Sequence, residues 1–182
     1  HPIETHTFDR LFLRLRQRLG AVCIPMKDTL REIISYRRKN QPVVIGYIAD
    51  QKPHWVNIHH WLYFLHHDTP VLTGTERIVK KVNHAVFFLD VRRVRRGYYE
   101  ATFKLITREP QKMPDYEITD AYFRLLEDSI RRAPEIWLWS HDRWKRTREE
   151  FNDRFEVIDG KVIAKDHPDN VPAPPRKPWY RF

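Results

Sequence analysis

The chain has 182 residues, of which 41% are hydrophobic and 13% aromatic, so it can bury a core and wholesale disorder is excluded. Lysine and arginine number 33 against 24 aspartate and glutamate residues, and the net charge of +9 favours acidic partners: nucleic acid, anionic lipid headgroups or an acidic protein. The single cysteine, Cys23, excludes a disulfide scaffold. No apolar run in the sequence approaches the roughly 20 residues of a membrane span.

Two helices are predicted in the first forty residues. Apolar residues recur at helical spacing over Phe8–Leu19, with arginines mostly on the opposite face. Thr7 is the expected N-cap of this helix, and Gly20 is expected just past its end. A second helix is expected over Asp28–Lys39, with Asp28 as its cap.

A short apolar run, Val43–Ala49, follows Pro42 and predicts a buried strand. It ends at Asp50 and Gln51, and the carboxyl ends of strands are where α/β sheets bind ligands. A carboxylate at that place must meet a cation or a backbone N–H group. Asp50 and Gln51 are therefore candidate site residues, with a helix or turn cap as the alternative.

The middle of the chain is less regular. The aromatic-rich segment Ile58–His67 is expected to be a short helix or an irregular packed segment, and Pro70–Thr73 a short strand. A helix over Thr75–Lys81 is expected to begin at Thr75 as its cap. Metal binding by the nearby histidines is disfavoured, because their spacing matches no zinc motif.

Two strands, Ala85–Val91 and Tyr98–Thr107, are predicted to form a hairpin in which Gly97 supplies a positive φ. Four arginines flank its tip and must face solvent or an anionic ligand: Arg92, Arg93, Arg95 and Arg96. A solvated basic edge and a phosphate contact fit this pattern equally well. Nucleic-acid binding is disfavoured, since no recognised nucleic-acid-binding motif is present.

The last clear helix is expected over Asp120–Ala133, capped by Thr119 or Asp120 and stopped by Pro134. Because strands and helices interleave, the expected fold is α/β, with a mixed, partly antiparallel sheet flanked by helices. Residues 1–156 are assigned to a single domain. Residues 157–182, where the pattern fades and prolines accumulate, are assigned to an extended tail.

The segment Pro134–Arg146 is dense in tryptophan and cations. Trp137, Trp139 and Trp144, with the neighbouring cations, are typical of a membrane–water interface. The alternative, slightly favoured for Trp137 and Trp139, is that the indoles pack in the core.

Several stretches together resemble the late acyltransferases of lipid A biosynthesis, within the wider glycerophosphate-acyltransferase-like group. They cover about residues 5–156, and the Asp-Gln pair combined with the ending Pro-Glu-x-Trp-x-Trp-x-His-x-Arg-x-Lys is the most specific part. The matching stretches are Phe8–Pro25, Ala49–Gln51, Asp68–Arg77, the strand pair around Gly97, and Pro134–Lys145.

The resemblance implies transfer of a fatty acyl chain from acyl carrier protein to a hydroxyl of a lipid A precursor or another glycolipid. It implies a single-span protein at the cytoplasmic face of the bacterial inner membrane, with no metal and no bound cofactor. A His-x-x-x-x-Asp or Glu dyad performs the chemistry in that family, with the histidine accepting the hydroxyl proton.

One departure from the family is clear: no histidine in this sequence has Asp or Glu five positions later. The dyad is expected before His1, with the membrane helix earlier still. The chain is thus expected to be the C-terminal two-thirds of the enzyme and to be inactive alone.

The resemblance, with position and charge, assigns roles to the candidate site residues. Asp50 and Gln51 would line the site. The acceptor or acyl pocket would be shaped by Thr73, Glu76 and Arg77. Phosphates or lipid headgroups would be contacted by Arg92, Arg93, Arg95, Arg96, Arg143 and Lys145. The alternative function is a non-catalytic basic module that binds an anionic membrane surface or nucleic acid.

Overall fold

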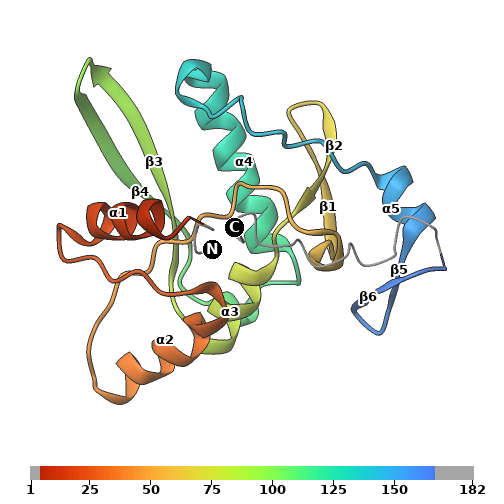
Figure 1. Cartoon of the computed structure of the whole chain (residues 1–182), viewed down its shortest axis with the longest axis horizontal. Coiled ribbons are helices and arrows are strands. Elements are labelled where there is room, and N and C mark those ends of the chain that lie inside the picture. The colour runs from red at the N-terminus through yellow and green to blue at the C-terminus, as the bar shows by residue number, and fades with distance from the viewer. Residues whose placement is uncertain (1–4, 167–182) are drawn as a thin grey trace, which may run out of the picture. The chain divides into compact units, whose positions relative to one another are not determined.

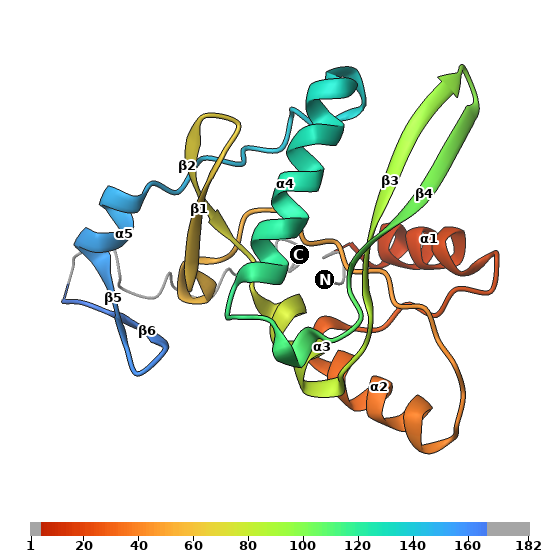
Figure 2. The same ribbon diagram turned by 180° about the vertical axis from the view of Figure 1, so that it is seen from behind.

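The computed structural model describes residues 5–166, apart from the side chain of Lys27 (Figures 1 and 2). Within these residues the chain forms five α-helices and three antiparallel strand pairs, which confirms the α/β class. The chain divides into one unit at His1–Gly46 and a second at Tyr47–Phe182. Each unit is described on its own.

The first unit contains the two predicted helices, α1 (His6–Gln17) and α2 (Thr29–Arg38). Helix α1 begins two residues before the expected start, so Thr5 rather than Thr7 occupies its N-cap position. Gly20 has a φ of 84°, as expected for the residue that turns the chain away after a helix.

The predicted buried strand at Val43–Ala49 is wrong. No strand forms there, and the side chains of Val44 and Ile48 are 91% and 78% exposed. A strand is stable only when its backbone N–H and C=O groups pair with a neighbour, and within residues 5–166 no strand is paired with this segment. Asp50 therefore follows irregular backbone instead of the end of a strand.

The second unit opens with a strand pair, β1 (His60–Phe64) and β2 (His67–Val71). β1 occupies the segment where a helix or irregular structure was expected. The two strands are joined by a tight turn at Leu65 and His66, whose φ angles are 49° and 66°. Positive φ at both central residues matches the right-handed twist of a hairpin, so the local turn favours strands over a helix.

The long hairpin is confirmed: β3 (Val86–Arg95) pairs with β4 (Tyr98–Thr107), and Gly97 in the turn has a φ of 80°. It forms an extended two-stranded ribbon (Figure 1). Phe88 on one face is buried, whereas Phe87 on the other is half exposed. The hairpin thus covers the core on one face only.

Two helices frame the core of this unit. Helix α3 (Gly74–Val82) begins after Thr73 instead of Thr75, and α4 (Glu117–Arg132) begins three residues before its expected start. Both views place α4 between the β3–β4 and β1–β2 pairs (Figures 1 and 2). The buried core joins these three elements through Phe64, Val71, Phe88, Phe123, Leu126 and Ile130.

The C-terminal part of the described chain differs from the expected extended tail. A short helix, α5 (Arg148–Arg154), leads into a hairpin of β5 (Phe155–Ile158) and β6 (Lys161–Ala164). A second apolar cluster forms there because Phe151 and Phe155 are buried and stack with their rings 5.7 Å apart. The rest of the expected tail, residues 167–182, lies outside the described residues.

Candidate functional site

A buried arginine with two unpartnered nitrogens is the most unusual feature in the described part of the second unit. The side chain of Arg143 is 2% exposed, and its guanidinium lies over the Phe123 ring, 5.3 Å from the centroid. Its Nη2 donates a hydrogen bond to the carbonyl oxygen of Pro70 at 3.3 Å. Its Nε and Nη1 have no hydrogen-bond partner among the residues that the structure describes.

The negative charge of Asp50 affects both this guanidinium and the Tyr122 hydroxyl. Burial lowers the pKa of Arg143 to about 10, and the negative charge of Asp50 opposes that shift. Burial raises the pKa of Tyr122, and the Asp50 charge raises it further. At neutral pH Arg143 therefore remains a cation and Tyr122 a neutral hydroxyl.

The Arg143 segment is bound to two short stretches of chain far away in sequence. Its residues follow α4, and they contact the loop after Asp50 and the end of β2. Four hydrogen bonds make these contacts besides that of Arg143: Lys52 N to His141 Nε2 at 3.1 Å, Lys52 Nζ to the Asp142 carbonyl at 2.9 Å, Trp144 Nε1 to Thr69 Oγ1 at 2.9 Å, and Arg146 Nη1 to the Pro53 carbonyl at 2.6 Å.

Glu76 is engaged in holding the fold. It is 4% exposed, and its carboxylate accepts hydrogen bonds from the backbone N–H groups of Tyr116 at 2.7 Å and Thr119 at 2.9 Å. The Thr119 hydroxyl also donates to it, at 2.6 Å. These donors lie at the start of α4, so Glu76 caps that helix from outside. Because the helix begins at Glu117, the expected caps Thr119 and Asp120 lie inside it and not at the N-cap position.

Thr73 and Arg77, the predicted site residues close to Glu76 in sequence, differ in burial. Thr73 is buried at the N-cap position of α3, whereas Arg77 is exposed. Burial lowers the pKa of the His59 imidazole, and the Arg77 charge lowers it further. Arg77 therefore lies near His59, at the start of the β1 segment.

The four arginines of the hairpin tip are exposed, as the sequence required. Arg92 forms an ion pair with Glu100 across the strands, and the guanidinium of Arg95 lies 3.7 Å from the centroid of the Tyr98 ring. Arg93 lies 3.6 Å from the Glu135 carboxylate. Arg96 forms no ion pair with any residue between 5 and 166, so it is the most available of the four.

Gln51 and Lys145, the remaining predicted site residues, are both exposed. Two tryptophans of the segment Pro134–Arg146, for which packing in the core was slightly favoured over a membrane–water interface, differ in their surroundings. Trp137 packs on Phe64 with the rings 6.3 Å apart, whereas Trp139 is 53% exposed and donates to the Pro134 carbonyl. The core interpretation is confirmed for Trp137 and wrong for Trp139.

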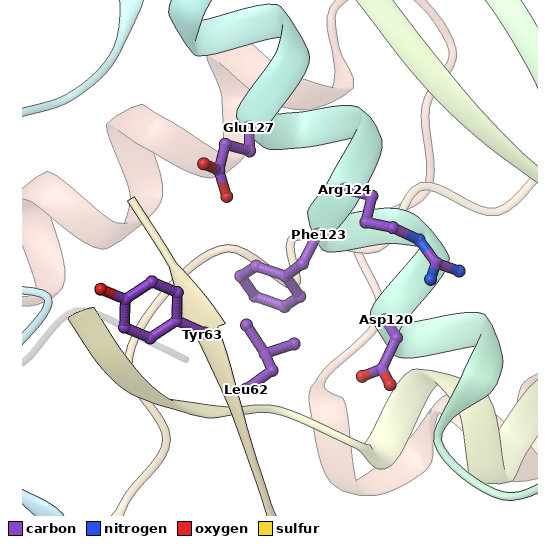
Figure 3. Close-up of a pocket in the computed structure, with 6 residues that line it drawn as sticks. All are labelled: Leu62, Tyr63, Asp120, Phe123, Arg124 and Glu127. Atoms are coloured by element: carbon purple, nitrogen blue, oxygen red, sulfur yellow. The ribbon is translucent and has the colours of Figure 1, made fainter. Parts of the chain in front are cut away.

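A pocket of about 190 Å³ lies between β1 and α4 and contains none of the predicted site residues (Figure 3). Leu62, Tyr63 and Phe123 form its apolar side, and α4 contributes Asp120, Arg124 and Glu127.

The Asp120 carboxylate of this pocket accepts a hydrogen bond from His60 Nε2 at 2.7 Å, and the His60 ring stacks on Tyr116 with centroids 4.4 Å apart. A carboxylate-bound imidazole can accept or donate a proton. Sequence reasoning missed this pair because its members are 60 positions apart and belong to no local motif. Within the described part of the chain, no group of three or more His, Cys, Asp or Glu side chains could hold a metal ion.

The comparison with known families agrees with the sequence pattern. The family model of the bacterial lipid A biosynthesis acyltransferases matches residues 2–146, which include Asp50, the long hairpin and Arg143. No curated protein matches the chain. Since the family model covers most of the sequence, the chain belongs to the bacterial lipid A biosynthesis acyltransferase family.

Proposed function

We propose that this protein takes part in the transfer of a fatty acyl chain from acyl carrier protein to a hydroxyl group of a lipid A precursor. The observation that carries the proposal is the family match over residues 2–146. The net charge of +9 supports it, because both an acidic carrier protein and a phosphorylated glycolipid are anionic.

The reaction requires the acceptor hydroxyl to lose its proton as its oxygen attacks the thioester carbonyl, while the carrier thiol leaves. The family dyad that accepts such a proton, His-x-x-x-x-Asp or Glu, does not occur in this sequence. We propose that residues encoded before His1 supply it. In this arrangement Asp50 and Gln51 contact the polar groups of the acceptor sugar.

The exposed cations of the β3–β4 hairpin, together with Lys145, are the proposed contacts for the acceptor phosphates. Arg96 and Lys145 suit this role best, since both are exposed and neither forms an ion pair with a described residue. A phosphate can also replace the Glu135 carboxylate at Arg93, because their 3.6 Å contact is at the surface and weak. Thr73 and Arg77 are proposed to shape the acyl or acceptor pocket.

We propose that the protein works at the cytoplasmic face of the inner membrane. Helix α1 supports this location, since its described residues include none that is buried and its apolar side chains Phe8, Leu11, Phe12 and Leu15 are 42–56% exposed. Arginines on the same helix suit anionic headgroups. None of the helices between residues 5 and 166 has the length and apolar character needed to cross a bilayer.

The test is an acyl-transfer assay with labelled acyl carrier protein and a lipid A precursor in detergent, followed by product mass spectrometry. The protein is assayed both as this chain and with the residues encoded before His1. We expect turnover only in the longer form and a loss of about 100-fold in the Asp50→Ala variant. Turnover unchanged by Asp50→Ala would remove Asp50 from the site.

The alternative, a non-catalytic basic module, is tested by binding. We expect binding to vesicles that contain anionic lipid and none to neutral vesicles. Binding to nucleic acid that weakens linearly with the logarithm of salt concentration, without lipid binding, would contradict the membrane location. A product acylated on another glycolipid would keep the reaction class and correct the acceptor.

A further inference from the structure

The segment 141–146 has no helix or strand, yet its residues form several hydrogen bonds with residues far away in the sequence. Its bonds with Lys52 and Pro53 join the loop that begins at Asp50. Its bonds to Thr69 and Pro70 join the end of β2. Because β2 belongs to the buried core, the segment ties the loop to the rigid part of the unit.

We propose that residues 141–146 form a clamp that holds the Asp50–Gln51 turn in place, and that His141 and Arg143 are positioning residues for Asp50. The proposal rests on the proposed function for the role of Asp50. It assigns Arg143 a task different from the expected contact with a lipid phosphate.

The burial of Arg143 is the first argument. With 2% of its surface exposed, the side chain cannot reach a phosphate of a bulky glycolipid at the surface. A buried guanidinium with two nitrogens lacking partners is costly unless a nearby anion compensates it. Asp50 is the acidic group whose charge acts on both Arg143 and Tyr122. Among the described residues Asp50 forms no hydrogen bond or ion pair with Arg143, so the buried cation acts on the carboxylate through its charge, while the Arg143–Pro70 and Lys52–His141 hydrogen bonds fix the two segments.

The backbone contact of His141 is the second argument. The Lys52 amide lies two residues after Asp50 and donates to His141 Nε2 at 3.1 Å, so the imidazole must carry its proton on Nδ1. The Lys52 side chain reaches the next carbonyl of the clamp, that of Asp142, at 2.9 Å. Backbone and side chain of one loop residue are thus bound by the clamp.

Two substitutions of His141 test this contact. Glutamine can present its amide oxygen where His141 presents Nε2, whereas leucine fills the space without an acceptor. His141→Leu should free the Lys52 amide, and His141→Gln should retain its bond. His54→Leu is the matched control, because His54 belongs to the same loop, is exposed and forms no side-chain hydrogen bond with a described residue.

The experiment measures hydrogen exchange of the Lys52 amide and steady-state kinetics in the same preparations of the longer form, which also carries the residues encoded before His1 and is the parent enzyme here. In His141→Leu we expect exchange to be at least about 10-fold faster and kcat to fall about 100-fold, with KM changed much less. In His141→Gln we expect the exchange rate of the Lys52 amide and kcat to lie within about threefold of the parent values. His54→Leu should match the parent in exchange and kinetics.

Arg143→Met is an independent test, because this substitution leaves the hydrogen bond between the Lys52 amide and His141 intact. We expect kcat to fall as in His141→Leu, while exchange of the Lys52 amide stays at the parent rate. Unchanged exchange in His141→Leu, or an equal change in His54→Leu, would overturn the clamp. Absence of turnover in the parent enzyme would contradict the proposed function alone, because the exchange measurements would still decide whether the clamp exists.

Discussion

Glu76 shows how one side chain can determine where a helix starts. Its carboxylate accepts three hydrogen bonds at the beginning of α4 and lies 3.1 Å from Lys80 Nζ. Glu76→Ala removes these acceptors and leaves buried donors unpaired, so we expect a loss of about 3 kcal/mol in the free energy of unfolding. Urea denaturation followed by circular dichroism measures it.

The control for this variant is Glu117→Ala, which removes an exposed carboxylate from the first turn of the same helix. We expect a change within about 0.5 kcal/mol, since Glu117 pairs with no described residue. Equal effects of the two variants would mean that Glu76 acts only through its general charge near the helix end.

Asp90 makes the stability of the second unit depend on pH. Burial alone would raise its pKa, but hydrogen bonds from Lys104, Arg132 and Ser129 outweigh burial and lower the pKa to about 2. Since the pKa is lower in the folded state than in the unfolded state, the stabilisation is complete above about pH 4 and is lost as the pH falls towards 2.

Asp90→Asn tests this dependence. We expect the parent to exceed the variant by on the order of 2 kcal/mol in unfolding free energy at pH 6, and the difference to shrink between pH 4 and pH 2. Urea titrations at several pH values measure it. Asp128→Asn, which removes an exposed carboxylate of α4, is the control. A difference that is constant with pH would show that the carboxylate charge is not responsible.

At the scale of the element, the two faces of β3 make unequal contributions to stability. Phe88 is 5% exposed and packs on Tyr122 with the rings 5.6 Å apart, whereas its neighbour Phe87 is 50% exposed. Phe88→Ala should cost about 3–5 kcal/mol in unfolding free energy because it opens a cavity in the core. Phe87→Ala, the matched control, should cost about 1 kcal/mol or less. Equal losses would mean that the outer face is also covered.

Elements whose signal is local could be predicted from the sequence. The helical spacing of α1, α2 and α4 and the Gly97 turn of β3–β4 depend on neighbours a few residues away, and all of them are confirmed. Val43–Ala49 failed because a strand needs a partner, which its own composition cannot supply. β1 was missed because its turn at Leu65 and His66 contains neither glycine nor asparagine, the usual residues at positive φ.

In the candidate site, too, residue types could be predicted from the sequence, whereas long-range contacts could not. Asp50 and Arg143 were each identified from a motif, but the effect of the Asp50 charge on Arg143 depends on the fold, because the two residues are 93 positions apart. The cap made by Glu76 and the pair of His60 with Asp120 were invisible for the same reason, since each joins α4 to a distant segment. Chemistry can be inferred from residue types, whereas roles require the contacts.

At the scale of the whole molecule, the chain divides at Gly46, inside a run that has no regular structure. Asn40 has a φ of 50°, and Val44 and Ile48 are largely exposed, so this run offers a protease accessible backbone without helix or strand hydrogen bonds. The turn at Arg96 and Gly97 is equally exposed, but the strands on either side of it are paired along their length.

Limited proteolysis with an enzyme of low sequence specificity should therefore cut first between residues 40 and 48. The fragment that begins near Tyr47 should persist, because it contains both buried clusters. The N-terminal fragment should be degraded further, since α1 contains no buried residue among those described and a 12-residue helix without packing is marginal in water. Mass spectrometry of the early products identifies the cut. First cleavage at residues 96–97 would show that the hairpin opens more readily than the run between the units.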